Sequence, residues 1–175
     1  MASFYTYLIA SLPMLHFGMK PPFSREIFLG ICEKLIPKDD LEILRAASIS
    51  GEDIQKHAEP PVLKKWRVFD AALRNDLVRL RAARKRLDAH RYLRQDDYAD
   101  SFITHIAAQA SRNPSILDAE IMLDQERWRF LDGLESGHFF DLDFLAVYSH
   151  KLLILERWDR INALDKSRAL EEALK

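Results

Sequence analysis

Apolar residues recur along most of this chain at the three- and four-residue spacing of amphipathic α-helices. No stretch of four or more residues alternates cleanly between apolar and polar positions, so no β-strand is predicted. Leucine, alanine, arginine, glutamate and aspartate are together far more frequent than valine, isoleucine and threonine, as in helix-forming sequences. The sequence therefore predicts an all-α protein, a packed bundle of about six to eight helices with one long central basic helix.

Prolines, glycines and capping residues divide this pattern into separate helices. Ser24 and Ser115 are good N-caps, and Pro13 and Pro37 each stop the helix before them. Residues 51–61 are predicted to be a connector, and the chain 1–175 is expected to be a single helical domain in which residues 1–50 and 62–175 could form two lobes. The predicted helices cover residues 4–12, 24–35, 39–47, 62–92, 98–110 and 115–137, with a last one starting near residue 141.

The apolar N-terminal segment MASFYTYLIASLPMLHF is predicted to be a buried first helix. It lacks the basic region and cleavage site of a signal peptide, and Pro13 interrupts it well short of the roughly 20 apolar residues of a spanning helix. Cys32, the single cysteine, lies in an apolar stretch and is expected to act as a small core hydrophobe in a reducing compartment. We therefore expect a cytoplasmic protein that reaches the membrane face only through partner proteins.

The predicted helix 62–92 combines an apolar stripe with a strong positive charge. Although the whole chain has a net charge of −1, residues 62–94 carry 11 basic and 3 acidic residues, and residues 96–175 carry 9 and 16. Arginines lie on both sides of the stripe, so they could pair with acidic helices or a protein partner, follow nucleic-acid phosphates or contact anionic lipid. The near-neutral total charge favours the first of these. Trp66, Leu73, Leu80 and Leu87 form the stripe at seven-residue spacing, with Leu63 and Leu77 beside them.

No complete catalytic or metal-binding motif is found in the sequence. It contains no glycine-rich phosphate loop, no G-x-S-x-G and no H-E-x-x-H, so the protein is expected not to be an enzyme and to hold no cofactor or metal. Glu135 and His138 form one Glu-x-x-His pair, but a di-iron bundle needs two such pairs, and Gly137 is expected to break the helix between them. Glu120 and Asp124 lie one turn apart and are expected to form a solvated acidic face.

Three long stretches resemble a known family. They are YTYLIASLPMLHFGMKPPFSREIFLGICEKL (residues 5–35), LRNDLVRLRAARKRLDAHRYLR (73–94) and LDAEIMLDQERWRFLDGLESGHFFDLDFLAVYSHKLLILERW (117–158). Together they resemble an uncharacterised bacterial family encoded among the subunits of V/A-type rotary ATPases. The last stretch is also similar to the socket protein of these machines, which is named C in bacterial V-type ATP synthases and d in eukaryotes. That protein is an all-helical funnel that seats the rotor shaft on the membrane ring, is about twice as long as this chain and is not catalytic.

The resemblance implies a non-catalytic accessory or central-stalk-associated component of a V/A-type ATPase, which acts by docking onto other subunits. The alternative is a stand-alone helical protein that binds nucleic acid through residues 62–94. Surface contacts with the partner are predicted at Arg67, Arg74 and Arg81, and next at Phe17 and Met19 in the loop between the first two helices.

Overall fold

Helices make up about three quarters of the part of the chain that the computed structural model describes, which is residues 5–47, 60–94 and 101–173, with side chains up to residue 164. No strand occurs within these ranges, so the all-α prediction is confirmed. The predicted connector, apart from Pro60 and Pro61, and the predicted helix starts near Phe4 and Tyr98 lie outside the described residues. The α-helices are α1 (Thr6–Ser11), α2 (Arg25–Glu33), α3 (Lys38–Ala46), α4 (Pro61–Lys85), α5 (Ser101–Arg112), α6 (Ile116–Glu135) and α7 (Leu142–Ala173), and a short 3-10 helix, η1 (Ala89–Tyr92), follows α4.

The predicted N-caps are confirmed. The Ser24 hydroxyl accepts a hydrogen bond from the Ile27 N–H at 3.2 Å, and the Ser115 hydroxyl accepts one from the Asp118 N–H at 3.1 Å. At the start of α7 the carboxylate of Asp141 accepts from the Phe144 N–H at 3.0 Å. Each contact satisfies one of the backbone donors that the first turn of a helix leaves unpaired.

Helix α4 ends seven residues before the predicted end at residue 92. Arg86 adopts a left-handed conformation with φ 53°, and the N–H of Leu87 reaches back to the carbonyl of Ala82 at 2.9 Å. This is a Schellman-type helix end in which an arginine occupies the position usually taken by glycine. Asn75 holds the returning chain, since its side chain donates to the Arg94 carbonyl and accepts from the Arg94 N–H, both at 2.9 Å. Leu87 is 55% exposed and does not belong to the packing stripe.

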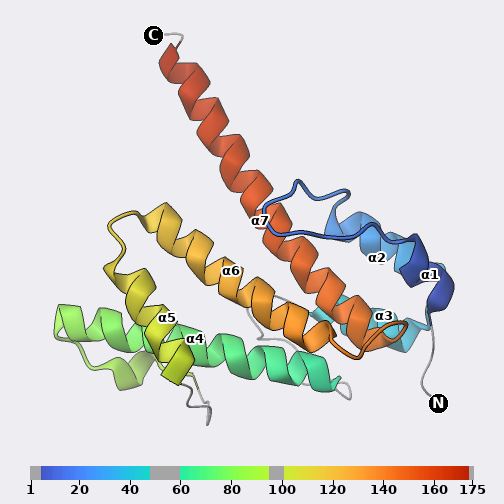
Figure 1. Cartoon of the computed structure of the whole chain (residues 1–175), viewed down its shortest axis with the longest axis horizontal. Helices are drawn as coiled ribbons and strands as arrows, with labels where there is room; N and C mark the ends of the chain where they lie inside the picture. Colours follow the sequence, from blue (N-terminus) through green and yellow to red (C-terminus); the bar gives the residue numbers. More distant parts are fainter. Residues whose placement is uncertain (1–4, 48–59, 95–100, 174–175) are drawn as a thin grey trace.

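Helices α4, α6 and α7 form the centre of the bundle (Figure 1). Helix α4 packs against α5, α6 and α7, while α6 lies along α7 and runs antiparallel to α4. Helices α2 and α3 pack on α7, and the last turns of α7 extend beyond the rest of the molecule. The molecule therefore has two sides, one covered by α1 to α3 and one formed by α4, α5 and α6.

The N-terminal helices are joined to α7 through Arg25. Its side chain donates to the Ser149 hydroxyl at 2.9 Å and to the carbonyls of Leu44 and Ala47, both at 2.6 Å. Burial lowers the pKa of Arg25, and the charge of Glu156 opposes this change. One side chain thus ties the start of α2 to the end of α3 and the middle of α7.

One apolar core includes residues from each of the described α-helices, α1 to α7. It includes the stripe residues Leu63, Trp66, Leu73 and Leu77, which are all buried, and the prediction of a packing face on α4 is confirmed for them. Leu80 is partly buried at the edge of the core. None of the described helices combines the length and the apolar composition needed to cross a membrane.

Candidate functional site

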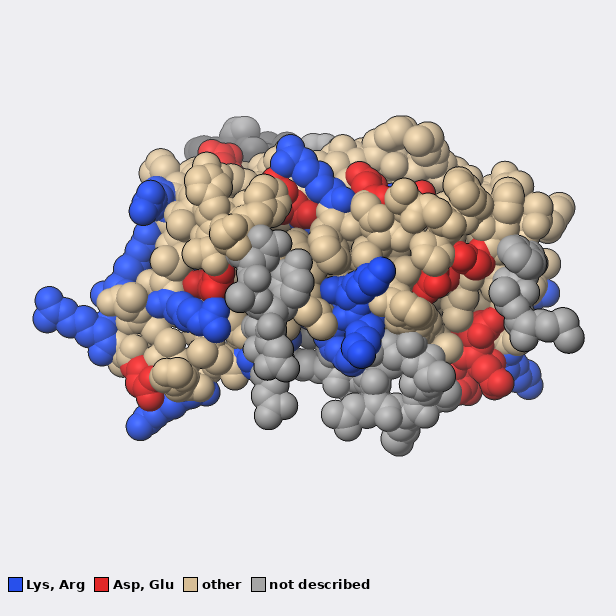
Figure 2. Space-filling model, turned by 60° about the horizontal axis from the view of Figure 1, so that its bottom comes forward, with Lys and Arg blue, Asp and Glu red and all other residues tan. Residues whose placement is uncertain are grey.

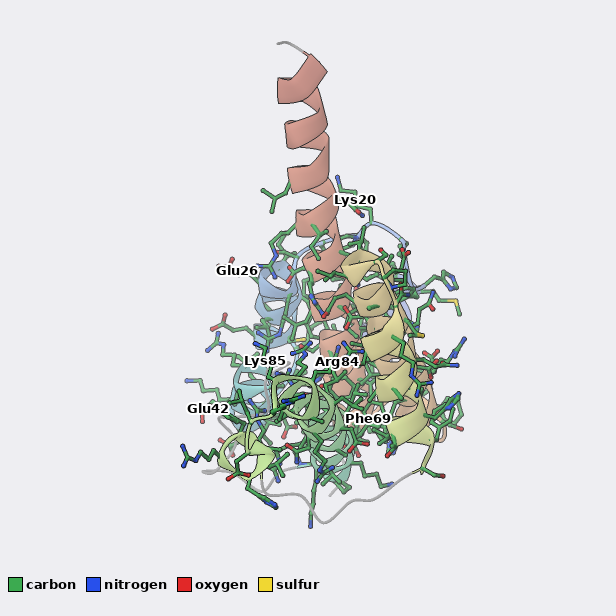
Figure 3. The ribbon with its side chains drawn as sticks, turned by 90° about the vertical axis from the view of Figure 1, so that its left-hand side faces the viewer. Lys20, Glu26, Glu42, Phe69, Arg84 and Lys85 are labelled. Carbon is green, nitrogen blue, oxygen red and sulfur yellow. The ribbon has the colours of Figure 1, made fainter. Side chains whose placement is uncertain are left out.

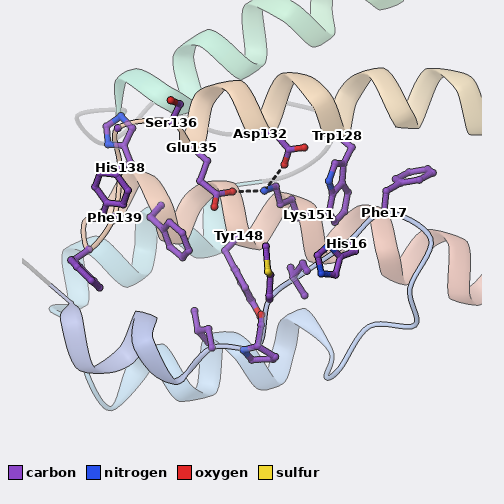
Figure 4. A pocket seen from close by; sticks show the side chains of 17 residues that line it. His16, Phe17, Trp128, Asp132, Glu135, Ser136, His138, Phe139, Tyr148 and Lys151 are labelled. Atoms are coloured by element: carbon purple, nitrogen blue, oxygen red, sulfur yellow. Dashed lines mark hydrogen bonds and ion pairs between the residues drawn. The ribbon is translucent and has the colours of Figure 1, made fainter.

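An aromatic pocket of about 680 Å³ lies between the loop after α1, the second half of α6 and the first half of α7 (Figure 4). Its volume falls in the range of small-molecule and peptide side-chain sites. The N–H of Tyr5 bonds to the Phe140 carbonyl at 2.6 Å, which holds the N-terminal segment against the turn between α6 and α7. The aromatic side chains that line it are His16, Phe17, Trp128, His138, Phe139, Phe140, Phe144 and Tyr148.

Lys151 of α7 lies at the base of the aromatic pocket, with its side chain only 8% exposed. Its ammonium group forms ion pairs with Glu135 and, at 2.7 Å, with Asp132, both on α6 (Figure 4). The same group lies 5.5 Å from the centroid of the Trp128 ring, within cation–π range. Lys151 thus links α6 and α7 through ion pairs to two carboxylates.

Two of the predicted contact residues are near this pocket. Phe17 is half-buried and meets Trp128 edge to face, with ring centroids 5.7 Å apart. Met19 is half-buried and its sulfur lies 3.2 Å from the backbone nitrogen of His16. Tyr148 donates to the Pro13 carbonyl at 2.9 Å, and burial raises its pKa. The loop is thus anchored by its own apolar groups, and Phe17 forms part of the pocket wall.

The three predicted contact arginines of α4 differ in their surroundings. Arg74 forms an ion pair with Asp70 one turn earlier, with 2.5 Å between Nε and Oδ2. Arg67 is half-buried, whereas Arg81 is exposed. These residues do not form one continuous cationic row, because Arg74 is directed into a buried carboxylate. On the face shown in Figure 2, Lys and Arg side chains are separated by acidic residues and by residues without charge, and they gather mainly at the end where α4 stops. Figure 3 views the molecule from that end, where Arg84 and Lys85 lie.

The prediction that Glu120 and Asp124 form a solvated acidic face is wrong for Asp124, which is buried in an ionic network. Its carboxylate accepts from Arg127 and Arg157, both at 2.8 Å, and from the Trp158 indole N–H at 3.0 Å. Arg157 also reaches Glu120 at 2.6 Å. The sequence could not show this burial, because the Arg157 and Trp158 partners come from another helix.

Arg127 connects this network to α4 through an ion pair with Asp70, whose Oδ1 lies 3.0 Å from the arginine Nε. Desolvation favours the neutral form of Arg127, but the charges and hydrogen bonds of Asp70 and Asp124 outweigh it, so its pKa is raised. The network therefore joins α4, α6 and α7 through paired charges.

His138 lies in a polar cluster at the turn between α6 and α7. Gly137, with φ 92°, follows the end of α6 as predicted, and Glu135 is engaged by Lys151. The Nδ1 of His138 instead lies 2.6 Å from Asp141 and 3.5 Å from Asp143. These three residues have possible ligand atoms within 4.8 Å of one another, a set that was not predicted although the H-x-x-D-x-D spacing could have indicated it. One oxygen of Asp141 already caps α7, so the cluster has a structural role in the turn.

A second concave feature, the α4–α6 groove, lies on the opposite side of the bundle from α1 to α3. It has a volume of about 640 Å³ and is lined by Lys64, Lys65, Val68 and Phe69 of α4 and by Arg129, Phe130, Gly133 and Leu134 of α6. The rings of Phe69 and Phe130 stack across it, with centroids 3.9 Å apart and planes inclined by 6°. The groove thus has an apolar floor and cations at its rim.

Gly133 lies inside α6, where glycine costs about 1 kcal/mol relative to alanine. A Cβ atom built at this position would meet nothing within 4 Å, so packing within the described part of the chain does not require a glycine there. The groove as a whole was not predicted, because it depends on the placement of α4 relative to α6.

Comparisons of the chain with protein-family models, with curated proteins and with solved structures gave no match. The function proposed below therefore rests on the residues of the two concave features and on the sequence.

Proposed function

We propose that this chain is a non-catalytic docking protein, an accessory or central-stalk-associated component of a V/A-type rotary ATPase. The sequence resemblance supports the choice of assembly, and the α4–α6 groove supports the mode of action. In this proposal the protein is cytoplasmic and is held at the membrane face by other ATPase subunits.

The observation that carries the docking function is the apolar floor of the α4–α6 groove. Phe130 and Leu134 are only half-buried, although they pack on the core, and Val68 beside them is also half-buried. An apolar surface of this kind, rimmed by polar groups, is typical of sites where another protein binds. Covering it on association would remove these side chains from water without any change in the core.

The arrangement of charge supports a structural role for the most buried ionic groups. Asp70, Asp124, Arg127 and Lys151 are each paired with at least one opposite charge on a side chain of another helix or of the same helix. Groups held in this way stabilise the relative positions of α4, α6 and α7. A general acid, a base or a nucleophile needs instead a group that can exchange a proton with substrate.

Nucleic-acid binding by α4 is the second candidate, and the exposed cations Arg84, Lys85 and Arg86 at its C-terminal end favour it. Asp70, however, engages Arg74, and Asp76 engages Arg79 at 2.6 Å on the same helix. These pairs place acidic groups between the arginines, which weakens any extended row of phosphate contacts.

The two candidates are separated by affinity purification of a tagged copy from cells of its own species, with an untagged strain as control. We expect V/A-type ATPase subunits to be enriched in quantitative mass spectrometry. We also expect no saturable binding of duplex oligonucleotide at physiological salt. Enrichment of nucleic acid in place of ATPase subunits, with a steep salt dependence of oligonucleotide binding, would contradict the docking proposal.

A further inference from the structure

The α4–α6 groove has a chemical character that restricts what can bind in it. Among the described residues, its lining includes three cations, Lys64, Lys65 and Arg129, and no carboxylate. Both lysines are exposed on α4, and Arg129, whose side chain is 68% exposed, forms an ion pair with Glu126 on its own helix. Asp143 on α7, which interacts electrostatically with Lys65, lies outside the lining. The rim therefore attracts a negatively charged ligand.

The floor of the groove adds an apolar requirement. Phe69 is almost completely buried and supports Phe130, which it stacks against, so the exposed edge of Phe130 is held in a fixed position. Val68 and Leu134 extend this apolar surface on the two helices. A ligand that matches both features has apolar groups along one side and anionic groups beside them.

The shape of the groove favours a helix as the ligand. Its lining residues recur one turn apart on both walls, Lys64 and Val68 on α4 and Arg129 and Gly133 on α6, and the two helices run antiparallel. A groove between two such helices accepts a third helix along its length, through apolar residues spaced three and four apart. Gly133 removes one side chain from the wall and allows a close approach of the ligand backbone.

We propose that the α4–α6 groove binds an acidic amphipathic helix of a partner protein, with the helix backbone lying over Gly133. This inference rests on the proposed docking function and adds the chemical class of the docked segment. The cations of the rim contact carboxylates of the helix, and the apolar side of the helix covers Phe130, Val68 and Leu134.

The glycines of the chain offer a matched test. In Gly133→Leu the new side chain enters the groove, whereas in Gly30→Leu the same change is made on α2, away from the groove. Neither Cβ would meet another atom within 4 Å, and both positions are inside helices, so both variants are expected to fold and to be at least as stable as the wild type. Circular dichroism and thermal unfolding check this point.

Binding is measured by fluorescence anisotropy with two labelled peptides of about 18 residues, or five helical turns. One peptide has leucines at helical spacing and glutamate at the remaining positions, and the other has lysine in place of every glutamate. We expect the glutamate peptide to bind the wild type and Gly30→Leu alike, at least about tenfold more tightly than the lysine peptide, with an affinity that falls as salt is added. Gly133→Leu should weaken binding of the glutamate peptide by about tenfold or more.

Three results would overturn the inference. These are equal binding of the two peptides, unchanged binding by Gly133→Leu, and no binding of the glutamate peptide to the wild type. In the third case laurate is tested as a single-chain anionic amphiphile, and its binding would show that the groove accepts a lipid-like ligand instead of a helix.

The two proposals fail in different ways. If the tagged wild type and Gly133→Leu enrich ATPase subunits equally, the helix-binding groove is wrong and the ATPase association stands. If the glutamate peptide binds as expected while no protein of the ATPase is enriched with the wild type, the groove stands and the assembly is wrong.

Discussion

The guanidinium of Arg127 on α6 and the carboxylate of Asp70 on α4 form a buried ion pair, with 3.0 Å between Nε and Oδ1. The basic helix α4 thus supplies the negative charge of this pair, and the more acidic C-terminal region supplies the positive charge. Pairing of the α4 arginines with acidic helices was one of the alternatives that the sequence left open, but in this buried link α4 contributes the carboxylate.

We predict that Arg127→Met destabilises the protein by about 3–5 kcal/mol, because it leaves the buried carboxylates of Asp70 and Asp124 without their shared cation. Arg79→Met is the control, since Arg79 pairs with Asp76 at the surface and its loss should cost less than about 1 kcal/mol. Urea unfolding of the two variants measures both values. Equal costs would mean that the buried network does not stabilise the helix arrangement.

Of the predicted contact residues, Arg74 and Arg81 should differ in how much their substitution changes the free energy of unfolding. Arg74→Glu removes a partner of the buried Asp70 carboxylate and brings a like charge beside it, so it should destabilise by roughly 1–3 kcal/mol. Arg81→Glu changes an exposed side chain and should alter stability by less than about 0.5 kcal/mol. Thermal and urea unfolding provide the comparison. A stability loss for Arg81→Glu as large as that for Arg74→Glu would contradict the structural difference between them.

Cys32 should be chemically inert in the folded protein. Its side chain is fully buried, and desolvation raises its pKa to about 12, so almost no thiolate is present at pH 8. We expect iodoacetamide to modify Cys32 at pH 8 only when urea unfolds the chain, as followed by intact mass. Modification of the native protein at the rate of an exposed peptide thiol would show that the thiol is accessible.

The titration of Asp143 should make the free energy of unfolding depend on pH. Burial raises its pKa above the ordinary value of 3.8, against the charge of His138, so the folded state holds this proton more tightly than the unfolded state. The contribution of Asp143 to stability therefore falls as pH rises from about 3.8 through the raised folded value. Asn does not titrate, so Asp143→Asn does not show this pH-dependent loss of stability. The unfolding free energy of the variant minus that of the wild type should therefore increase as the pH rises through this range. Urea titrations between about pH 3.5 and 6.5 measure the difference, and a constant difference would contradict the assignment.

Most helices were predictable because their determinants are local. The Ser24 and Ser115 caps and the prolines at 13 and 37 can be read from neighbouring residues, and the spacing of apolar side chains identified the buried face of α4. The end of α4 was not predictable in this way. It depends on Arg86 taking a left-handed conformation and on Asn75 binding the backbone of Arg94, which lies 19 residues away in sequence.

The candidate sites were predictable only in part. Phe17 was selected as an apolar loop residue, but its contact with Trp128 joins segments that are distant in sequence. The burial of Asp124 and the stacking of Phe69 on Phe130 likewise depend on how separate helices pack. Gly133 was not singled out from the sequence, although a glycine inside a helical pattern could have drawn attention to this part of α6.

The most direct measurement of the docking account is carbodiimide cross-linking of the tagged protein in complex with its partners, followed by mass spectrometry. This reagent joins lysines to carboxylates that are in contact, and Lys64 and Lys65 at the rim of the α4–α6 groove are exposed. We predict links from these two lysines to aspartate or glutamate residues on a helix of a V/A-type ATPase protein, and their loss in Gly133→Leu. Links between the proteins that involve other surfaces and leave Lys64 and Lys65 unmodified would contradict the account.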